Sequence, residues 1–190
     1  MSYEKIKGYI KTKKFTAMGL RSNDIKSLCN DNEIIKIKQG LYRQFDMFGQ
    51  NQSFVDVSVA YPRVVIAGFS ALVYHKLTTF LPSKVTVAIN RTARVPKLLY
   101  PPTNVLFVNK SFFNYGIMKV KDGRYSFKIY NAERTVCDAF KYRNQMGMDI
   151  AKECLVEYMK RKDKNINKLY EMSEKLKVKK IMEPWLMALV

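Results

Sequence analysis

The sequence has few of the residues that build metal centres and disulfide frameworks. Its 190 residues include three cysteines and one histidine, His75. An odd number of widely spaced cysteines argues against a disulfide framework or a zinc knuckle, so we expect Cys29, Cys137 and Cys154 to be buried free thiols. A single histidine excludes a histidine-rich metal site. We therefore predict neither a metal nor a cofactor.

Long apolar runs are also missing. The longest, from Val64 to Tyr74, is much shorter than the roughly 20 residues that cross a bilayer. The N-terminal residues alternate charged with apolar types and lack the continuous hydrophobic stretch of a secretory signal. We therefore expect no membrane partner and a cytoplasmic location. Apolar residues still make up 47% of the chain, enough for a folded core, which excludes wholesale disorder.

Acidic residues are scarce as well. The chain has 34 Lys and Arg against 16 Asp and Glu, for a formal net charge of +18. The interval from Val57 to Lys121 contains no acid at all, and its cations are Arg63, Lys76, Lys84, Arg91, Arg94, Lys97, Lys110, Lys119 and Lys121. Such unpaired positive charge favours a polyanionic partner, most commonly nucleic acid. A membrane surface, or a surface whose lysines only keep the protein solvated, are the alternatives.

Helical spacing and turn signals in the first quarter predict three helices and a hairpin. The helices are expected over 3–12, 15–18 and 23–30, and the strands over 34–38 and 41–43. Ser22 is the expected cap of the third helix, and Gln39-Gly40 is the expected turn of the hairpin. This order predicts a winged helix-turn-helix domain over residues 1–48.

In a winged domain the last helix enters the major groove and the hairpin meets phosphates. The exposed side of the third helix and the hairpin carry polar and basic residues that suit these contacts. The predicted DNA-binding residues are Arg21, Ser22, Asn23, Lys26, Lys36, Lys38, Gln39 and Arg43. The same order of elements also occurs in protein-docking modules, which stay an alternative.

A polar stretch from Asp46 to Gln52 predicts a boundary, with a second domain over 49–190. Apolar patterns predict a helix over 53–60, and either a buried helix or a strand running into a helix over 64–74. They also predict strands over 84–89, 105–108, 117–120 and 125–130. Asn131 is the expected cap of the first of three closing helices. The fold class is therefore α+β, and this domain is a mixed α/β domain with a small, largely antiparallel sheet and a helical C-terminus. Its predicted basic surface comprises Lys84, Arg91, Arg94 and Lys97.

Three segments together resemble the AbiEi-type antitoxin and transcriptional regulator family, over nearly the whole chain. They are KIKQGLYRQ at 36–44, PRVVIAGFSALVYHKLTTFLPSKVTVAINR at 62–91 and YNAERTVCDAF at 130–140. The resemblance implies an N-terminal winged domain, a C-terminal antitoxin domain and repression of the protein's own promoter, with double-stranded DNA bound at inverted repeats. It also implies a role in a type IV toxin-antitoxin system of abortive infection, against a nucleotidyltransferase toxin and without a stable complex.

The resemblance transfers the DNA-contacting role of the winged domain to particular residues of this chain, namely Arg21, Ser22, Asn23, Lys26, Lys38 and Arg43. The second helix, at 15–18, is shorter than the family pattern. A stand-alone regulator that binds nucleic acid or protein, without a toxin partner, is the alternative.

Enzymatic function is weakly supported by the sequence. Nucleotidyl transfer needs carboxylates that hold metal ions, and the strand after Gly68-Phe69-Ser70 has none. A thiol nucleophile would need His75 and Asp138 beside Cys137, whereas the spacing places Cys137 on an apolar helix face. We therefore predict no enzyme, a cap or core contact for His75, and an Arg134 that pairs with a neighbouring strand or carboxylate.

Overall fold

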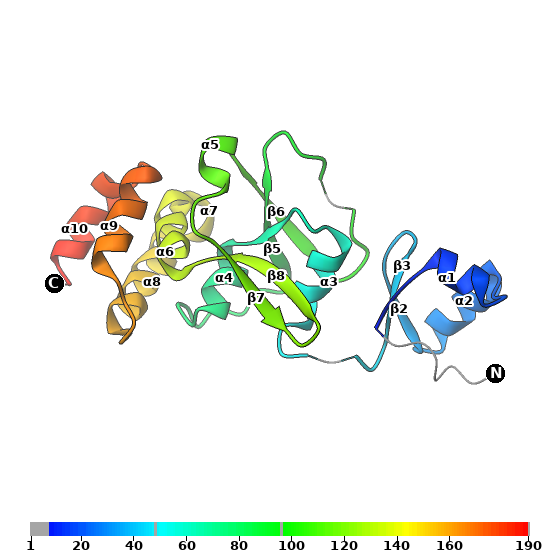
Figure 1. Ribbon diagram of the computed structural model, residues 1–190. Helices are drawn as coiled ribbons and strands as arrows, with labels where there is room; N and C mark the ends of the chain where they lie inside the picture. The colour runs from blue at the N-terminus through cyan, green and yellow to red at the C-terminus, as the bar shows by residue number, and fades with distance from the viewer. Residues whose placement is uncertain (1–7, 48, 96, 190) are drawn as a thin grey trace.

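The computed structural model describes residues 8–47, 49–95 and 97–189 of the chain. It is a mixed α+β protein, as the sequence predicted. Figure 1 shows a small N-terminal unit at one end, a five-stranded sheet in the middle and a group of helices at the other end. We refer to residues 8–47 as the N-terminal unit and to residues 49–189 as the body; the predicted division into two domains stays a prediction.

The N-terminal unit packs two helices on a three-stranded antiparallel sheet. Its elements are β1 (Tyr9–Lys11), α1 (Thr12–Ala17), α2 (Ser22–Asn30), β2 (Ile34–Lys38) and β3 (Leu41–Gln44). The strand order is β1-β3-β2, so β3 is central. The buried core of the unit is formed by Ile10, Phe15, Ile25, Leu28, Ile34 and Tyr42. The two predicted strands of the hairpin are confirmed, with the turn at Gln39-Gly40.

The first predicted helix, over 3–12, is wrong in its second half. Residues 9–11 form β1 and pair with β3, with Tyr9 opposite Arg43. Residues 3–7 lie outside the described part of the chain. Gly8 has a φ of +80°, which turns the chain into the extended segment, and strand pairing buries Ile10. The cap residue of α2 is Arg21 rather than Ser22, and the Asp24 carboxylate accepts a 2.7 Å bond from its backbone N–H.

The sheet of the body is mixed rather than largely antiparallel. Its strands are β4 (Val65–Ile66), β5 (Val85–Asn90), β6 (Thr103–Val108), β7 (Ile117–Asp122) and β8 (Tyr125–Tyr130), in the order β6-β5-β4-β8-β7. The pairs β4/β5 and β7/β8 are antiparallel, whereas β5/β6 and β4/β8 are parallel. The direction of β6 follows from the long loop after β5, which crosses back to the end where β5 began.

Helices cover both faces of this sheet. One face packs on α3 (Gln52–Ala60) and α4 (Gly68–Tyr74) through residues such as Val57, Ile66 and Phe127. The opposite face carries Val65, Ala88 and Tyr130 and is partly covered by α5 (Lys110–Phe113), a short helix that the sequence patterns did not predict. None of the helices in the described residues is long and apolar enough to span a bilayer.

Five helices, not the predicted three, close the chain. They are α6 (Ala132–Lys141), α7 (Arg143–Met146), α8 (Met148–Lys160), α9 (Ile166–Lys175) and α10 (Lys179–Met187). The predicted cap of α6 is confirmed, because Asn131 Oδ1 accepts the Arg134 N–H at 2.9 Å. Helix α6 is buried from Ala132 to Phe140 and packs against α8 and α9. The polar, four-residue α7 was too short for a periodic signal.

Candidate nucleic-acid interface

Helix α2 presents a polar face to solvent. Ile25 and Leu28 point into the N-terminal core, whereas the predicted DNA-binding residues Arg21, Ser22, Asn23 and Lys26 are all exposed. Among the described residues, the side chains of Arg21, Asn23 and Lys26 form no ion pair and no hydrogen bond with another side chain. The structure therefore brings this part of the predicted site together on the first half of one exposed helix.

The hairpin side chains are divided between solvent and the body. Gln39 is exposed at the turn and Lys36 is half-buried on β2. Lys38 does not offer a free ammonium to phosphate, because its Nζ donates to the Ala60 carbonyl at 2.5 Å and lies 4.1 Å from the centre of the Tyr61 ring. For Lys38 the prediction of a phosphate contact is corrected: this side chain attaches the hairpin to the body.

The predicted role of Arg43 in DNA contact is wrong. Its side chain is buried, with Nε 3.0 Å from Oδ1 of Asp56. Its Nη1 donates to the carbonyls of Gln44, Phe45 and Met47 at 2.9 to 3.1 Å. The physical reason is that β3 is the central strand of its sheet, so a side chain on the face toward α3 is covered. A signal was present in the sequence, because a carboxylate in the apolar segment at 54–60 needs a buried cation.

Asp56 is the centre of a buried polar network between the N-terminal unit and the body. Its side chain is fully buried and also accepts bonds from the Tyr9 hydroxyl at 2.5 Å and from Gln52 Nε2 at 2.8 Å. Burial, together with the hydrogen bond to Asp56, raises the pKa of Tyr9 well above its ordinary value. The carboxylate thus gathers donors from β1, β3 and α3, which fixes the orientation of the N-terminal unit on the body.

The four cations of the predicted basic surface in the body do not share one site. Arg94 and Lys97 line an open cleft of about 1330 Å³, together with Arg63 and Lys128; we call it the basic cleft. Lys84 lines another pocket, beside Leu81 and Tyr100. Arg91 lines a third. The sequence prediction missed Lys128, which lies on β8, because only the strand pairing brings it beside the β5–β6 loop.

The basic cleft adjoins the hairpin of the N-terminal unit. Tyr61, which lines the cleft, accepts the backbone N–H of Lys97 at 2.9 Å, and this bond holds the β5–β6 loop in place. The same loop donates from the Leu99 N–H to the Ile37 carbonyl of β2 at 2.8 Å. None of the described residues that line the cleft is acidic. The loop that carries Arg94 and Lys97 is therefore hydrogen-bonded both to Tyr61 and to the hairpin.

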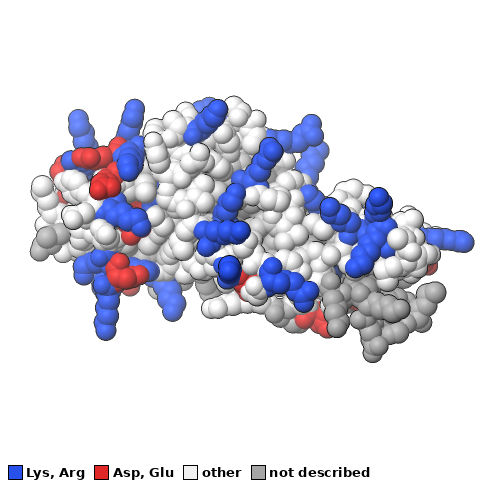
Figure 2. Space-filling model, viewed as in Figure 1, with Lys and Arg blue, Asp and Glu red and all other residues white. Residues whose placement is uncertain are grey.

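Positive charge in the middle of the molecule is not neutralised locally. Lys119 and Lys128 lie directly opposite each other on β7 and β8, and both are exposed. Like charges in this arrangement repel. In Figure 2 blue side chains cross the middle of the molecule with few red ones, whereas most red atoms lie beside blue ones over the C-terminal helices. This face is electrostatically suited to a polyanion.

Several cations of the last helices, by contrast, have carboxylate partners. The ion pairs there are Lys152–Asp149, Lys160–Glu157, Arg161–Asp163, Lys168–Glu133 and Lys179–Glu174. Between residues 57 and 121 the described part of the chain contains no acid that could form such a pair. The surplus charge therefore lies on the N-terminal unit and the middle of the body more than on the C-terminal helices.

The candidate nucleophilic and titratable groups of the body are buried. His75 caps the end of α4, and its Nε2 lies 2.7 Å from the Tyr130 carbonyl; burial lowers its pKa below the ordinary 6.5. Cys137 is buried, and burial raises the pKa of its thiol, so it is a poor nucleophile. Arg134 pairs with Asp138 at 2.9 Å, which confirms the expected carboxylate partner.

No group of three His, Cys, Asp or Glu side chains with metal-binding geometry occurs within residues 8–47, 49–95 and 97–189. The arrangement that the structure does provide is an exposed polar helix, a hairpin anchored to the body and a basic cleft beside it. No protein-family model matches this sequence, and a search of curated proteins likewise finds no match.

Proposed function

We propose that the N-terminal unit is a winged helix-turn-helix and that the protein binds double-stranded DNA as a transcriptional regulator. The observation that carries this proposal is the exposed polar face of α2. Helix α1 leads into α2 through a tight turn at Gly19, which has a φ of +81°, and the β2–β3 hairpin follows directly. This order, a first helix, a turn, the recognition helix and then the hairpin that forms the wing, is that of a winged helix-turn-helix.

The residues of α2 suit base readout in the major groove. In a helix-turn-helix, the first turns of the second helix reach base edges. Arg21 can donate two bonds to guanine and Asn23 can pair with adenine, whereas Lys26 adds affinity for phosphate. Ser22 lies beside them, and its hydroxyl suits either a base or a phosphate. With Lys38 and Arg43 attached to the body, the wing contacts are left to Lys36 and Gln39.

The basic cleft would extend the DNA-binding surface beyond α2. Arg63, Arg94, Lys97 and Lys128 supply four cations with no acid among the described lining residues. Because the Arg43–Asp56 pair and the Leu99–Ile37 bond fix the hairpin to the body, a duplex held by the N-terminal unit meets a surface of constant geometry. Phosphate contacts of this kind set register and affinity without reading sequence.

We further propose, on the resemblance described above, that this regulator is an AbiEi-like antitoxin that represses its own promoter and opposes a nucleotidyltransferase toxin. In this proposal α2 binds the promoter for repression, and the body protects the cell from the toxin. An Asn23→Ala variant should then lose repression of a promoter reporter while cells that express the cognate toxin still survive. If that variant loses protection as well, the two activities are not separated in this way.

The test of DNA binding is a gel-shift titration with the protein's own promoter region across a salt series. Each phosphate contact releases counterions, so we expect the logarithm of the association constant to fall steeply and linearly with the logarithm of the salt concentration. An unrelated duplex of equal length is the control. Equal affinity for both duplexes, or a flat salt response, would contradict operator recognition.

A further inference from the structure

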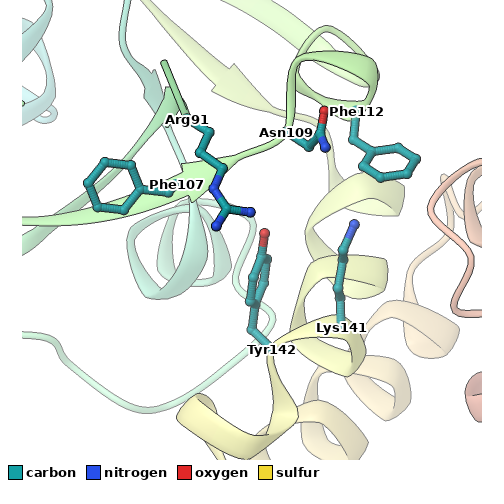
Figure 3. Close-up of a pocket in the computed structure, with 6 residues that line it drawn as sticks. All are labelled: Arg91, Phe107, Asn109, Phe112, Lys141 and Tyr142. Carbon is teal, nitrogen blue, oxygen red and sulfur yellow. The ribbon is translucent and has the colours of Figure 1, made fainter. Parts of the chain in front are cut away.

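A separate polar pocket lies where β6, α5 and the end of α6 meet. It is open, has a volume of about 520 Å³, and is lined by Arg91, Phe107, Asn109, Phe112, Lys141 and Tyr142. Pockets of this size are typical of small-molecule sites. None of these residues lines the basic cleft. In Figure 3 the polar ends of Arg91, Lys141 and Tyr142 turn toward a common space beneath Asn109.

The free polar groups around this space are hydrogen-bond donors. Arg91 and Lys141 are cations, and neither forms an ion pair within the described residues. Tyr142 supplies a hydroxyl. The Oδ1 of Asn109 accepts the N–H and the hydroxyl of Ser111 at 3.2 and 3.1 Å, which leaves the Asn109 amide nitrogen as the group available to a ligand. Four donors on three separate segments therefore converge on one volume.

The framework around the pocket holds these donors in place. The backbone N–H of Arg91 bonds to the Val108 carbonyl at 2.9 Å, which fixes the start of the loop against β6. Arg134, fully buried on α6, donates from Nη1 to the Phe112 carbonyl at 2.6 Å and so anchors α5. Lys141 and Tyr142 are adjacent at the end of α6 itself. A site built on a sheet edge and a buried helix is preorganised.

The charge balance of the pocket is positive. No acid is found among the described residues that line it. Asp138 lies one helical turn before Lys141 and Tyr142, but its Oδ2 is paired with Arg134 Nε at 2.9 Å. Two cations, a hydroxyl and an amide around such a volume are the groups that proteins use to bind phosphate. The pocket is also larger than one phosphate needs, and two phenylalanine rings, those of Phe107 and Phe112, line it.

These rings indicate what the phosphate is attached to. Phe107 on β6 is 49% exposed, a large apolar surface for a strand residue beside cations. The Lys141 Nζ lies 4.1 Å from the centre of the Phe112 ring. Aromatic faces beside phosphate-binding cations favour a nucleobase, which stacks on such rings. A nucleotide therefore fits the pocket better than a phosphosugar or a free phosphate does.

We propose that this pocket binds a nucleotide, with its phosphate groups between Arg91 and Lys141, Tyr142 and Asn109 donating to the phosphate oxygens, and the base against Phe107. The site is distinct from the proposed DNA interface, and it makes the protein a receptor for a small phosphorylated ligand. This proposal does not rest on the proposed DNA binding. Its test contains no DNA, so the two proposals can fail independently.

The test is isothermal titration calorimetry of the full chain with ATP, AMP and sodium phosphate as separate probes. We expect saturable binding in the order ATP, AMP, phosphate, from tightest to weakest. Arg91→Gln and Lys141→Gln should each weaken ATP binding at least tenfold, and Phe107→Ala should weaken ATP more than phosphate. Arg94→Gln is the matched control, because Arg94 lies three residues along the same loop but lines the basic cleft.

Three results would overturn the proposal. One is the absence of ATP binding at millimolar concentration. Another is equal weakening by Arg91→Gln and Arg94→Gln, which would indicate attraction to the general positive surface. The third is equal binding of ATP and phosphate with no effect of Phe107→Ala, which would reduce the site to a phosphate site without a base. A circular dichroism spectrum of each variant confirms that it is folded.

Discussion

The Arg43 guanidinium lies 3.0 Å from the Asp56 carboxylate, and neither side chain is accessible to solvent. Removing one partner of a buried pair leaves an uncompensated charge, and such changes cost about 3–5 kcal/mol. We therefore expect Arg43→Met to lower the free energy of unfolding by about that amount in a urea titration. Arg124→Met, at an exposed position, is the control. The double variant Arg43→Met/Asp56→Met should regain part of the loss, and equal stability of Arg43→Met and the control would refute the assignment.

On α2, Arg21→Ala and Asn23→Ala should each weaken binding to the specific promoter site by about 1–3 kcal/mol while binding to unrelated DNA changes little, because base contacts carry discrimination. Asn30→Ala is a matched control, since Asn30 is exposed at the other end of the same helix. Fluorescence anisotropy with both duplexes measures the difference. An equal loss on both duplexes would assign these side chains to phosphate contact.

The basic cleft should contribute affinity without specificity. The triple variant Arg94→Ala/Lys97→Ala/Lys128→Ala should weaken binding to promoter and unrelated DNA alike, and should reduce the slope of the salt dependence by about 0.9 for each phosphate that the variant no longer neutralises. A triple alanine variant at Lys160, Lys168 and Lys179 removes the same charge from ion-paired positions. If both triple variants lose affinity equally, net charge and not the cleft is responsible.

Gly116 precedes β7 with a φ of +75°, and a Cβ placed there would lie 2.6 Å from the Cβ of Arg134. Gly116→Ala therefore combines the left-handed backbone penalty of about 1–2 kcal/mol with overpacking of about 1–3 kcal/mol. Gly123→Ala isolates the first contribution, because Gly123 has a φ of +56° and no atom near its added Cβ. Thermal unfolding should show the larger loss for Gly116→Ala. Equal losses of stability in the two variants would mean that the Arg134 side chain moves away from the added methyl group without cost.

Protonation of His75 should destabilise the fold. Burial lowers the pKa of His75 in the folded state, so the unfolded chain binds a proton more readily, and stability falls as the pH drops below the unfolded value of about 6.5. His75→Gln removes this titration while it keeps an amide near the Tyr130 carbonyl. Relative to this variant, the natural chain should lose stability as the pH falls from about 7.5 to about 5.5 in urea titrations. Parallel profiles for the two proteins would exclude His75 as the source.

The sequence by itself determined the local elements with strong signals. Gln39-Gly40 between two apolar-rich segments specified the hairpin, and Asn131 before an amphipathic stretch specified the start of α6, because turn and cap chemistry acts over a few residues. The acid-free interval from Val57 to Lys121 established the excess of positive charge in the same way, since composition is independent of the fold.

Only the tertiary structure decided which of these charges are available. Arg43 and Lys36 are both cations on strands of the predicted hairpin. The central position of β3 nevertheless buries Arg43 against Asp56, whereas Lys36 stays half-exposed on β2. Strand pairing likewise placed Lys128 beside Arg94 in the basic cleft and left Arg91 in another pocket. These outcomes depend on contacts between residues far apart in the chain, which local patterns do not encode.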